Sequence, residues 1–209
     1  MKYIVEGDFD VSGNNLHTLL GCPERVGGNF DIFENDLTSL EGCPKWVGGY
    51  FNCDRNEFLV SLQGCPDYVG GHFACSNLHE IVSLEGCPRV VGGGFYCHHN
   101  YKLKTLKGGP KEVAERFEIT YNPALVSLVG CPKRVYYMDC HSNSSLVSLE
   151  GCPREIEHAF DCTQTPALKT LNHGWGERVI VGGHFFCDKR FTEDEVEKYF
   201  EVRGNIERF

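Results

Sequence analysis

The sequence repeats itself every 21 or 22 residues, and this periodicity constrains the fold more than any other feature. The tripeptide Gly-Cys-Pro, replaced once by Gly-Gly-Pro, recurs with successive spacings of 21, 22, 22, 22, 22 and 21 residues. Each copy follows a leucine that stands two residues before its first glycine. A unit this short cannot bury its apolar side chains alone and must stack on copies of itself. The chain is therefore expected to form a repeat solenoid.

One unit reads F-x-C-x-x-N-x-L-x-S-L-x-G-C-P-x-x-V-G-G-x. Its two apolar residues, for example Phe51 and Cys53, are two positions apart, which is the period of a strand. Each repeat is expected to contribute one short strand to a parallel concave sheet, and the last repeat to regain this register at Phe186 and Cys187. The asparagine that follows, such as Asn56, is predicted to hydrogen-bond the turns of neighbouring repeats.

The ends of the array define the expected domain organisation. Residues 1–191 are predicted to form a β-rich arc of about nine repeats that resembles a leucine-rich-repeat solenoid, with 1–16 as an N-terminal cap repeat. In residues 192–209, Thr192 and Glu195 have the spacing of a capping box, which predicts a short C-terminal helix and a tail. This helix is expected to cover the open end of the stack.

Twelve cysteines occupy two repeat positions, one in Gly-Cys-Pro and one in the predicted strand. At the strand position Val11, Ile32 and Ile119 replace cysteine, and Gly109 replaces it in the tripeptide. Small buried residues tolerate such exchanges, whereas disulfides and metal ligands do not. The cysteines are therefore expected to be free, reduced core residues.

Composition and motifs exclude several function classes from the prediction. The net charge of −9 disfavours nucleic acid as a partner. No apolar run approaches the length of a membrane span, and the N-terminal residues fit the first repeat rather than a signal peptide, so the expected location is cytoplasmic. No nucleophile elbow or phosphate-binding loop occurs, so neither an enzyme nor a cofactor is expected.

The outward residues of the predicted strands form ladders on one face of the sheet. Of three such ladders, one is mostly acidic and continues in the last repeat with Asp188 or its neighbour, and the third contains His99 and Tyr121. Aromatic residues and histidines gather near the middle of the face. Like charges on adjacent strands destabilise a sheet, which favours an acidic and aromatic surface that binds a basic patch on a partner protein over a merely solvated face. The candidate binding residues on this face are Phe33, Asp54, Tyr96, His98, His99, Glu118, Tyr121, Asp139, His141 and Asp161.

A second candidate surface lies where the repeats stop agreeing. The Gly-Gly pair of the unit is replaced in three consecutive repeats, by Ala114-Glu115, Tyr136-Tyr137 and Glu157-His158. Either the solenoid bends differently there, or Tyr136, Tyr137 and His158 form a binding edge together with Glu115 and Arg116. A row of basic residues after the prolines is expected to be solvated. This row consists of Arg89, Lys111, Lys133 and Arg154.

Two other functions remain open. One is a small-ligand or metal-binding module that uses the central His, Asp and Tyr cluster, with Asp139, His141 and His98 as the metal ligands. The spacing of His98, two strands from the other two, disfavours the metal site. The other is a structural component that associates with itself.

The unit also resembles a known family. Leu40, Cys43 and Pro44 fall where the short leucine-rich repeats of bacterial effectors have a leucine, a second leucine and a second proline, although Glu41 replaces the first proline. The motif L-x-S-L-x-G-C-P-x-x-V-G-G-x-F-x-C is similar to that of leucine-rich repeat proteins of large tailed phages. The resemblance implies a binding function only. If it extends to phages, it implies an inhibitor of a host protein, such as a defence factor, in the bacterial cytoplasm.

Overall fold

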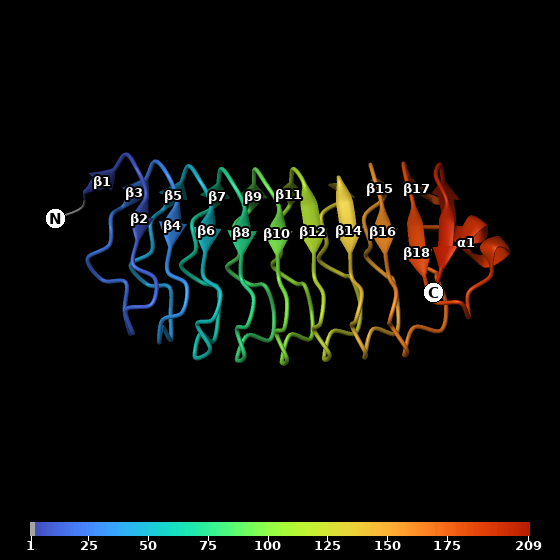
Figure 1. Ribbon diagram of the computed structural model, residues 1–209, viewed down its shortest axis with the longest axis horizontal. Coiled ribbons are helices and arrows are strands. Elements are labelled where there is room, and N and C mark those ends of the chain that lie inside the picture. The colour runs from blue at the N-terminus through green and yellow to red at the C-terminus, as the bar shows by residue number, and fades with distance from the viewer. Residues whose placement is uncertain (1–2) are drawn as a thin grey trace.

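The computed structural model describes residues 3–209 as a single stack of coils, each stacked on the one before (Figure 1). The predicted strands all lie in one parallel ten-stranded sheet that runs the length of the stack. Its strands are, in order, β2 (Phe9–Asp10), β4 (Phe30–Asp31), β6 (Phe51–Asn52), β8 (Phe73–Ala74), β10 (Phe95–Tyr96), β12 (Arg116–Glu118), β14 (Tyr137–Asp139), β16 (Phe160–Asp161), β18 (Phe185–Cys187) and β20 (Ile206–Arg208). The fold is therefore a β-solenoid, as the periodicity predicts.

Each coil contributes two strands, so the expectation of one strand per repeat is incomplete. The second strand ends at the valine that precedes the Gly-Gly corner, with that valine buried and the residue before it facing outward, as in Trp46–Val47. These strands form a six-stranded and a four-stranded sheet. The six are β1 (Ile4–Val5), β3 (Arg25–Val26), β5 (Trp46–Val47), β7 (Tyr68–Val69), β9 (Val90–Val91) and β11 (Glu112–Val113), and the four are β13 (Arg134–Val135), β15 (Glu155–Ile156), β17 (Val179–Val181) and β19 (Phe200–Val202).

The second wall of the solenoid is thus interrupted between β11 and β13, whereas the ten-stranded sheet continues through the same coils. The corner that joins β13 to β14 is one residue shorter than the others. Val135 and Met138 are three positions apart, whereas the equivalent Val113 and Phe117 are four apart. One residue of extended chain spans about 3.3–3.6 Å, so the corner before β14 is shorter by this length. With β14 held in register in the ten-stranded sheet, β13 is displaced and does not pair with β11.

The interior is a column of stacked rings beside a column of thiols. Successive phenylalanines from Phe9 to Phe117 have ring centroids 5.0–6.0 Å apart. Such ring pairs contribute about 0.5–1.5 kcal/mol each beyond their area burial. All twelve cysteines are free, as predicted, and the six on the strand side are fully buried. The chain is held together by repeated packing rather than by covalent links.

The asparagine column forms as predicted. Asn122 accepts a hydrogen bond from the amide of Asn100 (2.9 Å) and donates to the carbonyl of Cys97 (2.9 Å), both in the preceding coil. Asn143 makes the same bond to the amide of Asn122 (2.9 Å). Leu78 replaces one asparagine of the column, but its backbone amide still donates to Asn100 Oδ1 (2.8 Å). The amides therefore connect consecutive coils through buried hydrogen bonds.

The helix α1 (Glu193–Tyr199) lies at the C-terminal end of the stack, where the sequence predicts it (Figure 1). The amide of Glu195 donates to Thr192 Oγ1 (3.2 Å), and Val196 is buried. The residues after the helix, expected to be a tail, instead form β19 and β20 and so add a further coil. No helix in residues 3–209 has both the length and the apolar character needed to cross a bilayer.

The register of the last full repeat differs from the prediction. Phe185, not Phe186, is buried, because it pairs with Phe160 and stands four residues after Val181, as Phe51 does after Val47. Phe186 pairs with Asp161 and faces outward. The additional phenylalanine in this repeat made the prediction ambiguous, and the spacing from the valine resolves it.

Candidate functional site

The outward face of the ten-stranded sheet carries the predicted ladder in register. We call this surface the ladder face. Its main column runs Asp10, Asp31, Asn52, Ala74, Tyr96, Glu118, Asp139, Asp161, Phe186 and Glu207. The sequence placed Asp188 or its neighbour on this column after Asp161, and the structure places Phe186 there.

Three consecutive acidic residues distinguish the middle of this column. Glu118, Asp139 and Asp161 stand side by side on β12, β14 and β16. The side chains of Glu118 and Asp139 are only 14% and 13% exposed. Burial raises the pKa of Glu118 and of Asp161, and the neighbouring charge of Asp139 adds to both shifts. A cation placed here would therefore relieve an unfavourable arrangement of charge.

Arg116 supplies part of that compensation. Its Nη1 lies 2.6 Å from Glu118 Oε1, and this contact partly offsets the effect of burial on the pKa of Glu118. The guanidinium also lies over the ring of Tyr137, 4.3 Å from its centroid. One arginine beside three carboxyl groups leaves the acidic group with a net negative charge.

Two histidines flank the acidic residues and have opposite pKa shifts. His141 Nδ1 lies 2.7 Å from Asp139 Oδ1, and this hydrogen bond raises the pKa of His141. His98 Nδ1 lies 2.7 Å from Thr120 Oγ1, and burial lowers the pKa of His98. Near neutral pH, His141 is thus the more readily protonated of the two and the better counterion for the acidic group.

The aromatic part of the cluster stands on a left-handed turn that follows each strand. His99 and Tyr121 have φ of 56° and 55°, so they are not the third outward ladder of a strand that the sequence suggested. Their rings stack at 4.7 Å, and Tyr121 meets His141 at 5.0 Å. Tyr96 completes the group, 6.1 Å from His98. The structure therefore brings the predicted central aromatic residues together.

Two predicted site residues lie apart from this cluster. Asp54 accepts a hydrogen bond from the amide of Ser76 (2.5 Å), and burial raises its pKa to about 6. Phe33 lies under the guanidinium of Arg55, 5.4 Å from the ring centroid. Both belong to coils nearer the N-terminus and are separate from the central group.

The predicted edge residues lie together beside the ladder face. The ring of His158 is 5.4 Å from Tyr136 and 6.4 Å from Tyr137. Burial and the nearby carboxylates raise the pKa of Tyr137 to about 12. Because Arg116 contacts both Tyr137 and Glu118, the edge and the acidic group form one continuous surface.

A possible metal site uses different residues from the expected set. Asp139, His141 and Asp161 each offer an atom within 4.8 Å of the others. His98 is not part of this group, because it points to Thr120 and lies 3.7 Å from Glu118. Asp161 was expected to bind a partner rather than a metal, and its pairing with Asp139 on the next strand is what brings it into the group.

These features define a β-solenoid with an acidic and aromatic cluster on one face. Comparison of the chain with models of protein families, with curated proteins and with solved structures finds no match. The resemblance to leucine-rich repeat proteins and to phage proteins therefore stays a prediction, and the function must be argued from the surface itself.

Proposed function

We propose that the protein is a non-enzymatic binding module that docks a basic patch of a partner protein on the ladder face. The observation that carries this proposal is the run of Glu118, Asp139 and Asp161 in register on adjacent strands. Their half-buried carboxyl groups lie beside stacked aromatic rings. Lysine or arginine side chains from a partner would neutralise the carboxylates, while the rings would supply contact area.

The rigid sheet suits such a function. The carboxyl groups are fixed by the strand register and by short hydrogen bonds, such as those from the Thr163 amide (2.8 Å) and hydroxyl (2.7 Å) to Asp161. A preformed surface loses little conformational entropy when a partner binds. If the resemblance to phage proteins holds, the partner would be a bacterial host protein that the module inhibits in the host cytoplasm.

The test is affinity capture from bacterial lysate, read by mass spectrometry, with three versions of the protein. The first is the wild type, and the second replaces Tyr96, His98 and Tyr121 by alanine. The third is a matched control that removes three exposed aromatic residues elsewhere, Phe58, Tyr68 and Tyr101.

The proposal predicts one protein that is held by the wild type and the control and lost by the ladder-face variant. Capture by all three versions would overturn the assignment to this face. Circular dichroism of each version would establish that the variants keep the wild-type fold.

A second candidate function is binding of a divalent metal by Asp139, His141 and Asp161, which the closeness of their ligand atoms favours. His141 Nδ1 and Asp139 Oδ1 already lie 2.7 Å apart, and an ion bound by both would take the place of the proton that they share. Zinc would then raise the melting temperature of the wild type with the logarithm of its excess over the dissociation constant, but not that of Asp161→Asn. An equal shift in both would exclude this site.

A further inference from the structure

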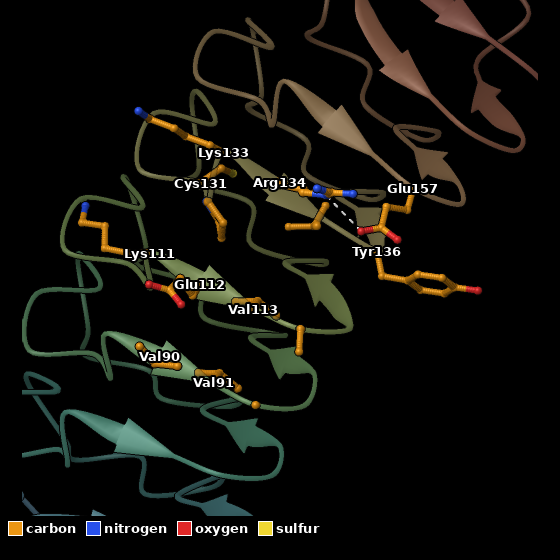
Figure 2. A pocket seen from close by; sticks show the side chains of 14 residues that line it. Val90, Val91, Lys111, Glu112, Val113, Cys131, Lys133, Arg134, Tyr136 and Glu157 are labelled. Atoms are coloured by element: carbon orange, nitrogen blue, oxygen red, sulfur yellow. Dashed lines mark hydrogen bonds and ion pairs between the residues drawn. The ribbon is translucent and has the colours of Figure 1, made fainter.

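The interruption of the second wall opens a groove between β11 and β13 (Figure 2). The groove has a volume of about 540 Å³, and it lies on the wall formed by the second strands, not on the ladder face. Its floor is apolar and includes Val90, Val91, Val113 and Val135, and Tyr136 stands at its rim. Val113 is 6% exposed, whereas Val47 and Val69 in intact coils are 0% exposed. The break therefore gives solvent access to the edge of the core.

One backbone hydrogen bond of the continuous wall is missing at the break. The amides of Gly92 and Ala114 donate to Val69 O (2.8 Å) and Val91 O (3.1 Å) of the coil before, whereas the amide of Tyr136 turns to Glu115 O (3.2 Å). Within residues 3–209, Val113 O is thus left without the donor that its equivalents have, and a carbonyl on a strand edge is a ready acceptor for another chain.

The charged groups at the groove are mostly basic. Within residues 3–209, Arg134 forms ion pairs with Glu155 (3.3 Å) and Glu157 (3.0 Å), whereas no ion pair holds Lys111 or Lys133. Both lysines are exposed and extend from the loops at the mouth of the groove (Figure 2). Glu112 also lines the groove, so its unneutralised charge consists of two lysines against one glutamate. The groove is a local basic site on an acidic protein.

We propose that this groove binds a short acidic peptide segment that carries bulky apolar side chains. Carboxylates of the segment would contact Lys111 and Lys133, and an apolar side chain would rest on the valine floor. A backbone amide of the segment would donate to the carbonyl of Val113, whose usual donor is turned away. This site is distinct from the ladder face, which attracts basic groups, so one module would bind two segments of opposite charge.

The test uses a fluorescently labelled, N-acetylated peptide of sequence Glu-Leu-Glu-Leu-Glu, with binding followed by fluorescence polarisation. The groove variant is Lys111→Glu with Lys133→Glu. The matched control is Lys45→Glu with Lys104→Glu, which changes the net charge equally at exposed lysines where the wall is intact. We expect the dissociation constant to rise at least about tenfold in the groove variant and to change less than about twofold in the control.

A second variant addresses the groove itself rather than its charge. Insertion of one glycine between Val135 and Tyr136 restores the usual spacing of the corner and should pair β13 with β11. We expect this variant to keep the circular dichroism spectrum of the wild type and to lose peptide binding.

Three results would overturn the proposal. The first is equal loss of binding in the groove variant and the lysine control. The second is wild-type binding in a folded glycine-insertion variant. The third is binding of the Lys-Leu-Lys-Leu-Lys counterpart as tightly as the acidic peptide, or binding of a fatty acid without binding of the peptide.

Discussion

Two halves of the solenoid are built from the same unit but differ at one corner. In residues 25–97 every corner has two glycines after the valine, and the second wall is continuous. These corners leave no room for a side chain, because a Cβ on Gly48 would lie 2.1 Å from the carbonyl oxygen of Gly27. In residues 111–161 the same position holds Ala114, Tyr136 and Glu157, and the wall breaks between β11 and β13.

The difference indicates which residues serve packing and which are available for binding. In the regular half, contact between coils dictates glycine at the corner. In the irregular half the corners have bulkier residues, and the same coils carry Glu118, Asp139 and Asp161 on the ladder face. The acidic run of the ladder face and the corner at Tyr136 therefore both lie where the repeat departs from its own pattern.

The largest expected effect on stability comes from exchanging glycine and alanine at the corners of the two halves. Gly48→Ala would force the coils apart at a backbone contact that cannot yield, at a cost of about 2–3 kcal/mol. Ala114→Gly removes a side chain from an exposed position and should change stability by less than about 1 kcal/mol. Urea unfolding of the two variants checks this difference. Equal effects would mean that the two corners are packed alike.

A smaller effect is expected from the asparagine column. Asn122→Ala leaves the amide of Asn100 and the carbonyl of Cys97 without their buried partners, at a cost of about 1–3 kcal/mol. Thermal unfolding should show a lower melting temperature than that of the control Ser144→Ala, which alters an exposed residue. An unchanged melting temperature would show that water replaces the lost bonds.

The pH dependence of stability should show the titration of Asp54, which lies in the regular half. Because burial raises its folded pKa to about 6, its contribution is present below the unfolded value near 3.8 and is lost as the pH rises through about 6. Asp54→Asn keeps an acceptor for the Ser76 amide and removes this titration. Its unfolding midpoint should therefore exceed that of the wild type at pH 7.5 and approach it at pH 4. A constant difference between the two proteins would contradict the assignment.

The smallest expected effect separates the two histidines of the irregular half. The contribution of His141 to stability is present below its unfolded pKa and is lost as the pH rises through its raised folded value. That of His98 has the opposite sign and is lost as the pH falls below its unfolded pKa. NMR titration should find the pKa of His141 above that of His98, and Asp139→Asn should lower the pKa of His141 more than that of His98, which lacks the hydrogen bond to Asp139. The reverse order would contradict the hydrogen bond from His141 to Asp139.

The solenoid, the inward pairs, the asparagine column and the C-terminal helix could be predicted because stacking forces each of them to recur with the repeat. The second strand and the final coil were missed, although Val202-x-Gly204-x-Ile206 has the spacing of Val181-x-Gly183-x-Phe185. The left-handed turn at Tyr121 could not be inferred, because such residues are uncommon without glycine. The groove depends on one missing residue between Val135 and Met138, whose consequence appears only when the coils are stacked.

The most direct test of the central claim compares matched charge changes in the two halves. The irregular-half variant combines Glu118→Gln, Asp139→Asn and Asp161→Asn, and the control combines Asp8→Asn, Asp10→Asn and Asp31→Asn, so each loses three negative charges. Both variants and the wild type would be used to capture partners from the same bacterial lysate. The account predicts one protein held by the wild type and the control and lost by the irregular-half variant. Loss of that protein from the control and its retention by the irregular-half variant would contradict it.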